Sequence, residues 1–222
     1  MDFLLDWPIL RWDAVRGIAN NGLTRAAGII PLVGYLILFN DRIADFMSFN
    51  TIAGVGELSP SPFLFDGIVK LRLTFFGSLF LLSSYCLFRI FRPAVLNEAR
   101  GDLDFSSRVW ETYSVYEIAF MEDQVFSDRW RPRTKSFWVI LGRVRQRKPV
   151  LSGYRPDVRS AMFAQHGDYI RFLSREWWMG MMHTYRGARV AAMVFGIGGY
   201  LFLAVPSIDI AQAVLREVVW GR

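Results

Sequence analysis

Three apolar segments divide the chain at intervals that suit membrane crossings. The longest is Val190–Ile208, nineteen residues without a charged side chain, which as a helix rise about 28 Å and nearly match a hydrocarbon core of about 30 Å. The second, Leu73–Phe88, has sixteen uncharged residues between basic flanks. Because long basic side chains reach back to the interface, we extend this crossing to 71–91. Pro206 and Asp209 stand where we expect the last helix to break and meet water.

The remaining segment, 26–39, is the shortest of the three. Its fourteen uncharged residues include Pro31 and give about 21 Å of helix. Two structures suit this length: a crossing lengthened by the side chain of Arg25, or a half-span packed against the other two helices. We favour the crossing, so the pattern predicts an all-α membrane protein with three transmembrane helices.

The distribution of basic residues predicts the orientation of these helices. The segments 1–25, 40–72, 89–189 and 209–222, which are the parts of the chain outside the three uncharged runs, hold three, three, eighteen and two lysines plus arginines. Basic residues concentrate on the cytoplasmic side of membrane proteins. We therefore expect a bacterial inner-membrane protein with its N-terminus inside. The expected non-membrane parts are a cytoplasmic N-terminal segment 1–25, an external loop 40–70, a mainly helical basic cytoplasmic domain 92–189 and an external tail 209–222.

Composition agrees with a membrane location and excludes several classes of protein. Hydrophobic residues make up 53% of the chain, charged residues 21%, and the mean hydropathy is +0.24, which excludes a disordered chain. One cysteine, Cys86, cannot support a disulfide scaffold or a cysteine-rich metal site. The net charge of +6 suits either nucleic acid or an anionic bilayer.

The cytoplasmic domain is expected to contain two main helices. Apolar positions at Val109, Tyr113, Tyr116 and Phe120 recur at helical spacing and predict an amphipathic helix over 107–126. Ser106 or Ser107 is a suitable N-cap for it.

A second helix is predicted from Pro156 or Asp157 toward Tyr185, with Met162, His166, Tyr169 and Leu173 on one face. Near its end Trp177, Trp178, Met179, Met181 and Met182 gather, and we interpret them as an interfacial belt. A methionine-rich partner groove is the alternative. Between the helices, 137–141 reads as a short strand.

The candidate binding residues form two basic clusters on either side of this apolar stretch. They are Arg129, Trp130, Arg131, Arg133, Lys135, Arg143, Arg145, Arg147 and Lys148. Such a segment beside a membrane is typical of contact with anionic lipid head groups or with a soluble protein partner. Nucleic acid, with the tryptophans as stacking surfaces, is the less favoured alternative.

Small and polar side chains predict contacts between the membrane helices. Ala192, Gly196 and Gly199 form a small-residue stripe that lets another helix approach closely, and we expect a homo-oligomer. Ser83, Ser84, Tyr85 and Cys86 form a polar stripe on the second crossing.

No catalytic motif accompanies these features. The chain lacks a nucleophile elbow, a phosphate loop and a zinc-protease motif. His166 and His183 have no cysteine nearby and do not suggest a metal pair. The crossings as drawn contain no central charge, which argues against ion transport. We therefore expect no enzyme activity, no metal and no cofactor.

Several segments of the membrane part resemble known proteins. Gly34–Asp41, Pro62–Asp66, Leu71–Gly77 and Leu203–Ser207 are similar to the spans of a family of uncharacterised bacterial multi-pass membrane proteins. In size and layout the chain also resembles the membrane subunit of Kiwa-type anti-phage systems, which implies a soluble DNA-binding partner and a role in antiviral defence.

The resulting expectation is a non-enzymatic membrane sensor or scaffold subunit whose basic domain binds a soluble partner. The alternative is an oligomeric pore or transport accessory subunit, which requires the polar stripe to face an axis. A membrane-embedded enzyme that modifies lipids ranks third.

Overall fold

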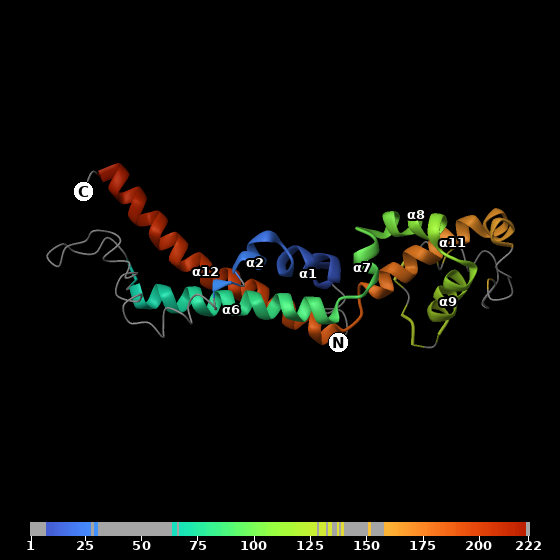
Figure 1. Ribbon diagram of the computed structural model, residues 1–222, viewed down its shortest axis with the longest axis horizontal. Coiled ribbons are helices and arrows are strands. Elements are labelled where there is room, and N and C mark those ends of the chain that lie inside the picture. Colours follow the sequence, from blue (N-terminus) through green and yellow to red (C-terminus); the bar gives the residue numbers. More distant parts are fainter. Residues whose placement is uncertain are drawn as a thin grey trace. The chain divides into compact units, whose positions relative to one another are not determined.

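A computed structural model describes residues 8–27, 29–30, 64–65, 67–127, 129–131, 133–134, 137, 139, 151 and 158–220. All regular structure in these residues is helical, which confirms the all-α class. The predicted first crossing beyond Ile30 and most of the loop 40–70 lie outside the described residues. The described 3₁₀ helix and α-helices are drawn in Figure 1: η2 (Pro8–Leu10), α1 (Trp12–Ala19), α2 (Gly22–Ala27), α6 (Gly67–Phe91), α7 (Val95–Glu98), α8 (Asp102–Thr112), α9 (Val115–Val125), α11 (Arg159–Met181) and α12 (Arg186–Trp220).

The chain divides into two compact units. Unit 1 consists of Met1–Asp13 and Arg92–Arg186, and unit 2 of Ala14–Phe91 and Gly187–Arg222. Unit 1 thus begins, after α6, at the residue where the sequence predicts the cytoplasmic domain to begin.

Unit 2 contains two helices that are long and apolar enough to cross a membrane. They cover Val69–Phe91 and Arg186–Arg216. The second is longer than the sequence predicts, because Pro206 lies inside α12 and does not end it. Asp209 is only 2% exposed, and its carboxylate lies 2.6 Å from the Lys70 ammonium. The expected break into water at these two residues is therefore wrong. Prolines are tolerated in membrane helices where neighbouring groups satisfy the freed backbone.

Small residues bring α6 and α12 into close contact. A Cβ added to Gly199 would lie 2.8 Å from the carbonyl oxygen of Gly77, so the two backbones touch there. A hydrogen bond also joins these two helices, because the Ser84 hydroxyl of α6 donates to the Ala192 carbonyl of α12 at 2.7 Å. Close approach with interhelical hydrogen bonds is how membrane helices associate.

The N-terminal helices α1 and α2 are separated by a polar break. The Asn21 side chain accepts from the Thr24 backbone N–H at 2.7 Å and so caps α2. The Thr24 hydroxyl donates to the Ile18 carbonyl at 2.7 Å, which satisfies one of the last carbonyls of α1. Tyr200 of α12 accepts from Asn21 at 2.6 Å, and α2 also packs against α6.

In unit 1, α11 packs against both α8 and α9. The single helix predicted over 107–126 is wrong, because α8 ends at Thr112 and α9 begins at Val115. The cause is a capping box: the Ser114 hydroxyl accepts from the Glu117 N–H, and the Glu117 carboxylate accepts from the Ser114 N–H. A new helix start at Ser114 overrides continuation of the first helix.

This break also changes which residues are buried. Tyr116 and Phe120 are 67% and 59% exposed, whereas Ile118 is fully buried, so the predicted stripe fails beyond Tyr113. The N-cap of α8 is Gly101, and neither Ser106 nor Ser107 serves as its cap. The remaining buried apolar residues of α9 are Val115, Met121 and Val125.

The second predicted helix corresponds to α11, with Met162 and Leu173 fully buried. It does not run on into the last crossing, because residues 182–185 are non-helical and Tyr185 has a φ of 49°. Trp178 is 2% exposed and its ring lies 5.4 Å from that of Phe105. Its place is thus the protein core, and the interfacial-belt interpretation is wrong for this residue.

The strand predicted over 137–141 is also not observed. Phe137 and Val139, the described residues of this stretch, are helical. Phe137 is fully buried and its ring lies 5.9 Å from that of Tyr169. A short apolar run cannot be assigned to strand or helix by periodicity alone.

Candidate functional site

The first basic cluster comprises Arg129, Trp130, Arg131, Arg133 and Lys135 and follows α9 in the sequence. Its described residues lie on the helical core of unit 1. Arg129 and Arg131 are exposed, whereas Trp130 and Arg133 are half-buried. The other predicted binding residues, Lys135, Arg143, Arg145, Arg147 and Lys148, lie outside the described residues.

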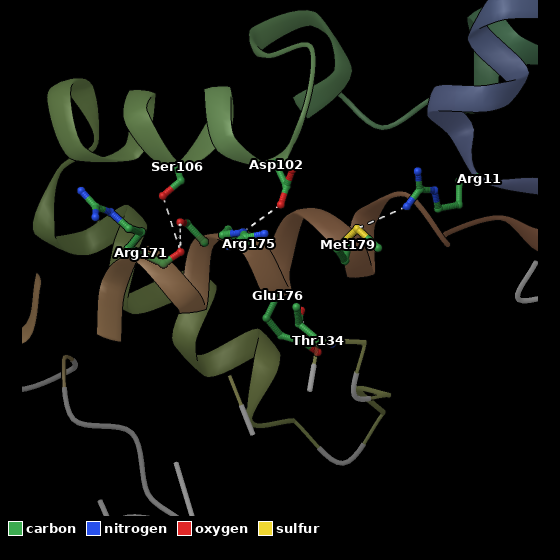
Figure 2. Close-up of polar contacts among 9 residues, drawn as sticks. Arg11, Asp102, Ser106, Thr134, Arg171, Arg175, Glu176 and Met179 are labelled. Carbon is green, nitrogen blue, oxygen red and sulfur yellow. Dashed lines mark hydrogen bonds and ion pairs between the residues drawn. The ribbon is translucent and has the colours of Figure 1, made fainter. Parts of the chain in front are cut away.

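A buried carboxylate fixes this cluster to α11. Glu176 is fully buried, and its carboxylate accepts from the backbone N–H groups of Arg133 at 2.8 Å and Thr134 at 2.6 Å. It also accepts from the Thr134 hydroxyl and from the Trp130 indole N–H at 3.0 Å. Figure 2 shows the Thr134 and Glu176 side chains next to one another below α11. Charge-assisted hydrogen bonds are stronger than neutral ones, so these four hold the segment firmly.

Trp130 contributes to this anchoring rather than presenting its ring to a partner. A Cβ added to Gly180 would lie 2.1 Å from the Trp130 ring, so the indole rests against the bare backbone of α11. Its N–H is already engaged by Glu176. The sequence-based assignment of Trp130 as a stacking surface therefore does not match the structure, since a half-buried tryptophan uses its polar handle inside the protein.

A second buried carboxylate holds the far end of the same stretch. Glu122 of α9 is fully buried and accepts from the Leu151 backbone N–H at 2.7 Å and from the Tyr169 hydroxyl. Burial raises the pKa of Tyr169 above its usual value, and the hydrogen bond to Glu122 raises it further. Tyr169 therefore remains a protonated donor at physiological pH. The second basic cluster, 143–148, falls in the sequence between the two anchored points, Thr134 and Leu151.

Polar contacts also fix α8 on α11 (Figure 2). Asp102, in the first turn of α8, forms an ion pair with Arg175 at 2.8 Å, and the Ser106 hydroxyl donates to the Arg171 carbonyl at 3.5 Å. Arg159 donates to the carbonyls of Trp110 and Tyr113, which satisfies orphan acceptors at the end of α8. The basic cluster therefore rests on a well-connected helical base.

The N-terminal residues of unit 1 join this base at the end of α11. The Trp12 indole donates to the Thr184 carbonyl at 3.0 Å, and the Trp12 backbone N–H donates to Met182 at 3.2 Å. Arg11 donates to the Met179 sulfur at 3.8 Å, as Figure 2 also shows. Trp12 is fully buried, so residues 11–12 are an integral part of unit 1.

Sequence reasoning missed a charged pair between the two long helices. Lys70 and Asp209 are 1% and 2% exposed, and Asp209 also accepts from the Leu64 backbone N–H at 2.9 Å. A signal for this pair was present: Lys70 lies nineteen residues before Arg89 on α6, and Asp209 twenty residues after Arg189 on α12. Opposite charges at matched depth in neighbouring antiparallel crossings are expected to pair.

The small-residue stripe lies in a contact within the chain. Ala192, Gly196 and Gly199 are all buried. Ser84 of α6 bonds to Ala192, and an added Cβ at Gly196 would lie 2.5 Å from Ile18 of α1. These residues thus assemble one chain, and nothing in this contact calls for a second copy.

No metal centre or known relative adds to this description. Among the residues that the structure describes, no three histidine, cysteine, aspartate or glutamate side chains are grouped so that they could hold a metal ion. No protein-family model, curated protein or solved structure matches the chain.

Proposed function

We propose that the protein is a non-enzymatic membrane sensor or scaffold subunit whose basic cytoplasmic unit binds a soluble, acidic protein partner. The observation that carries this proposal is the double anchoring of the basic stretch by Glu176 and Glu122. A segment that only sets topology, or that touches mobile lipid head groups, needs no fixed backbone. A segment that docks on a protein benefits from one, because an ordered binding surface loses less conformational entropy on association.

The charges of unit 1 suit such a partner. Residues 89–189 carry eighteen basic and eleven acidic side chains, and both anchoring carboxylates are buried. The anchors therefore add little negative charge to the surface, where Arg129 and Arg131 are exposed. Complementary charge accelerates encounter and selects the partner, and anionic head groups nearby would orient the unit at the membrane.

The hydrogen bonds of Trp12 support the proposed three crossings. They make residue 12 part of the same unit as Arg92–Arg186, which supports a topology in which residues 12 and 92 lie on one side of the membrane. If α6 crosses once, the chain must cross once more between α2 and α6, and 26–39 is the apolar segment available. With the basic unit inside, the N-terminus is cytoplasmic and the tail external in a bacterial inner membrane.

The layout also fits a role in defence. A multi-pass subunit that senses a membrane event and passes it to a soluble partner is the arrangement that the resemblance to Kiwa-type systems implies. The alternative of a pore built on the α6 polar stripe has less support, because Ser84 is buried against Ala192. The sensor or scaffold role therefore has the better support.

Capture from native membranes tests the proposal. The tagged full-length protein should retain a stoichiometric soluble protein, and the variant Arg129→Glu/Arg131→Glu should lose it while still inserting. The matched control is Arg100→Glu/Arg108→Glu, which reverses two exposed arginines outside the anchored stretch and should retain the partner. Equal capture by both variants, or recovery of lipid alone, would count against protein docking.

A further inference from the structure

The two long helices allow the depth of each residue in the membrane to be estimated, if they cross as proposed above. On α12, the helix that is long and apolar enough to cross covers Arg186–Arg216, and Tyr200 is next to its middle residue, Leu201. About 15 Å of helix on either side of this point spans a hydrocarbon core of about 30 Å, so Tyr200 lies close to the midplane.

The polar break between α1 and α2 lies at this same depth. Asn21 donates to the Tyr200 hydroxyl at 2.6 Å, and the Thr24 and Tyr200 hydroxyls lie 2.7 Å apart. Ile18 also touches Gly196, one turn earlier on α12. Three independent contacts thus bring residues 18–24 against the middle of a membrane helix, although the sequence favours a cytoplasmic location for them.

Among the described residues, α2 has one face buried against the protein and an opposite face that is exposed. Thr24 and Ala27 are buried, whereas Gly22, Leu23 and Arg25 are exposed. The Arg25 guanidinium donates to the Asn20 side chain at 2.9 Å and carries further N–H groups. At the midplane its side chain is too far from either interface to snorkel.

A charged side chain and an interrupted backbone at membrane depth occur where protein or water surrounds them, and not in contact with lipid. We propose that the exposed face of α2 borders water in the middle of the membrane, and that Arg25 attracts inorganic anions to this water. This proposal rests on the membrane crossings of the proposed function and adds a property that the scaffold role does not require.

The same geometry explains the short apolar segment 26–39. If residues 14–25 already occupy the inner half of the membrane, only about 15 Å remain, which about ten helical residues can cross. Fourteen uncharged residues are therefore sufficient. The described helices α1 and α2 then form an interrupted, polar inner half of this crossing, a form that membrane proteins use where a helix lines water.

Thiol labelling in native membranes tests the proposal, because the chain has a single cysteine. In a Cys86→Ser background, the probe is Gly22→Cys, since a Cβ added at Gly22 meets nothing within 4 Å. The matched control is Leu201→Cys, which is next to Tyr200 in sequence and 63% exposed toward the expected lipid. The reagents are two charged methanethiosulfonates, one anionic and one cationic, with rates normalised to those for free cysteine.

Gly22→Cys should react with both reagents and prefer the anionic one, and Leu201→Cys should react with neither. Adding Arg25→Gln should lower the anionic-to-cationic rate ratio roughly tenfold, because one charge sets the local counter-ion concentration. Arg25→Lys should preserve the ratio, which separates a charge effect from misfolding. Absence of labelling at Gly22→Cys, or a ratio insensitive to Arg25→Gln, would overturn the proposal. Labelling of Leu201→Cys would instead overturn the membrane crossing on which the proposed function depends.

Discussion

Removing the Glu176 carboxylate should release the basic cluster from α11. The variant Glu176→Ala loses four hydrogen bonds to a buried charge, each with a net contribution of about 1.5–3 kcal/mol. Hydrogen bonds that share one carboxylate are not additive, so we expect a loss of about 3–5 kcal/mol of anchoring free energy, as for other broken buried charge interactions. Since about 1.4 kcal/mol is a factor of ten, the released population should rise by more than about a hundredfold.

Limited digestion with trypsin in mild detergent measures this release. Cleavage after Arg133 should accelerate strongly in Glu176→Ala, because proteolysis follows the population of the open form. Cleavage after Arg108, within α8, should stay unchanged and so separate local release from global unfolding. Glu111→Ala removes an exposed carboxylate and is the control. An Arg133 cleavage rate within about twofold of wild type, in a folded variant, would refute the anchoring.

Three further substitutions test the rest of the fold by thermal unfolding in mild detergent. Gly196→Leu should lower the melting temperature, because even a Cβ would lie 2.5 Å from an α1 side chain; an unchanged value would mean that this face looks at lipid. Asp209→Asn should cost about 3–5 kcal/mol, because it leaves Lys70 buried without its counter-charge, and adding Lys70→Met should recover most of the loss; no recovery would argue against the pair. Ser114→Ala should cost about 0.5–2 kcal/mol through loss of the cap. The backbone N–H and the hydroxyl of Ser114 both donate to the Glu117 carboxylate and lower its pKa from the ordinary value of 4.5, so the stabilisation from these two bonds is present above that value and is lost as the pH falls through the lowered pKa. Ser114→Ala removes only the bond from the hydroxyl, so the melting temperatures of wild type and variant should draw closer in acid, and a constant difference would contradict that bond.

The sequence is informative where one physical effect dominates. Nineteen uncharged residues after Arg189 leave few alternatives to a membrane-length helix, because an apolar run of this length is too long for most soluble elements. The face formed by Met162, His166, Tyr169 and Leu173 likewise predicts α11. Its partners could not be predicted, because packing against α8 and α9 depends on contacts between residues far apart in sequence.

Competing local signals explain most of the wrong predictions. The apolar stripe through Val109 and Tyr116 favours one continuous helix, whereas Ser114 and Glu117 favour a new helix start. The new start forms because the capping box supplies local hydrogen-bond partners for backbone N–H groups. The prediction that the last helix meets water at Asp209 is wrong for a different reason. A charge near the end of an apolar run looks solvent-exposed unless its partner, Lys70, is placed at the same depth.

The buried carboxylates could have been suspected from their position. Glu122 follows Met121 and precedes Val125 by three residues, and Glu176 follows Leu173 by three, so both interrupt apolar faces. An acidic residue at such a position requires internal donors. Which donors they are cannot be read from spacing, since the backbone N–H groups of Thr134 and Leu151 carry no sequence signature.

The proposed topology and docking role are tested most directly by measuring on which side of the membrane each loop lies. Reporter domains fused after Ser59 and after Gly153, one active only outside and one only inside the cytoplasm, determine it in living cells. We predict that Ser59 lies outside and Gly153 inside, with the basic unit facing its soluble partner. Finding both positions on the same side would show that α6 does not cross the membrane, and it would contradict the docking role and the water-facing break together.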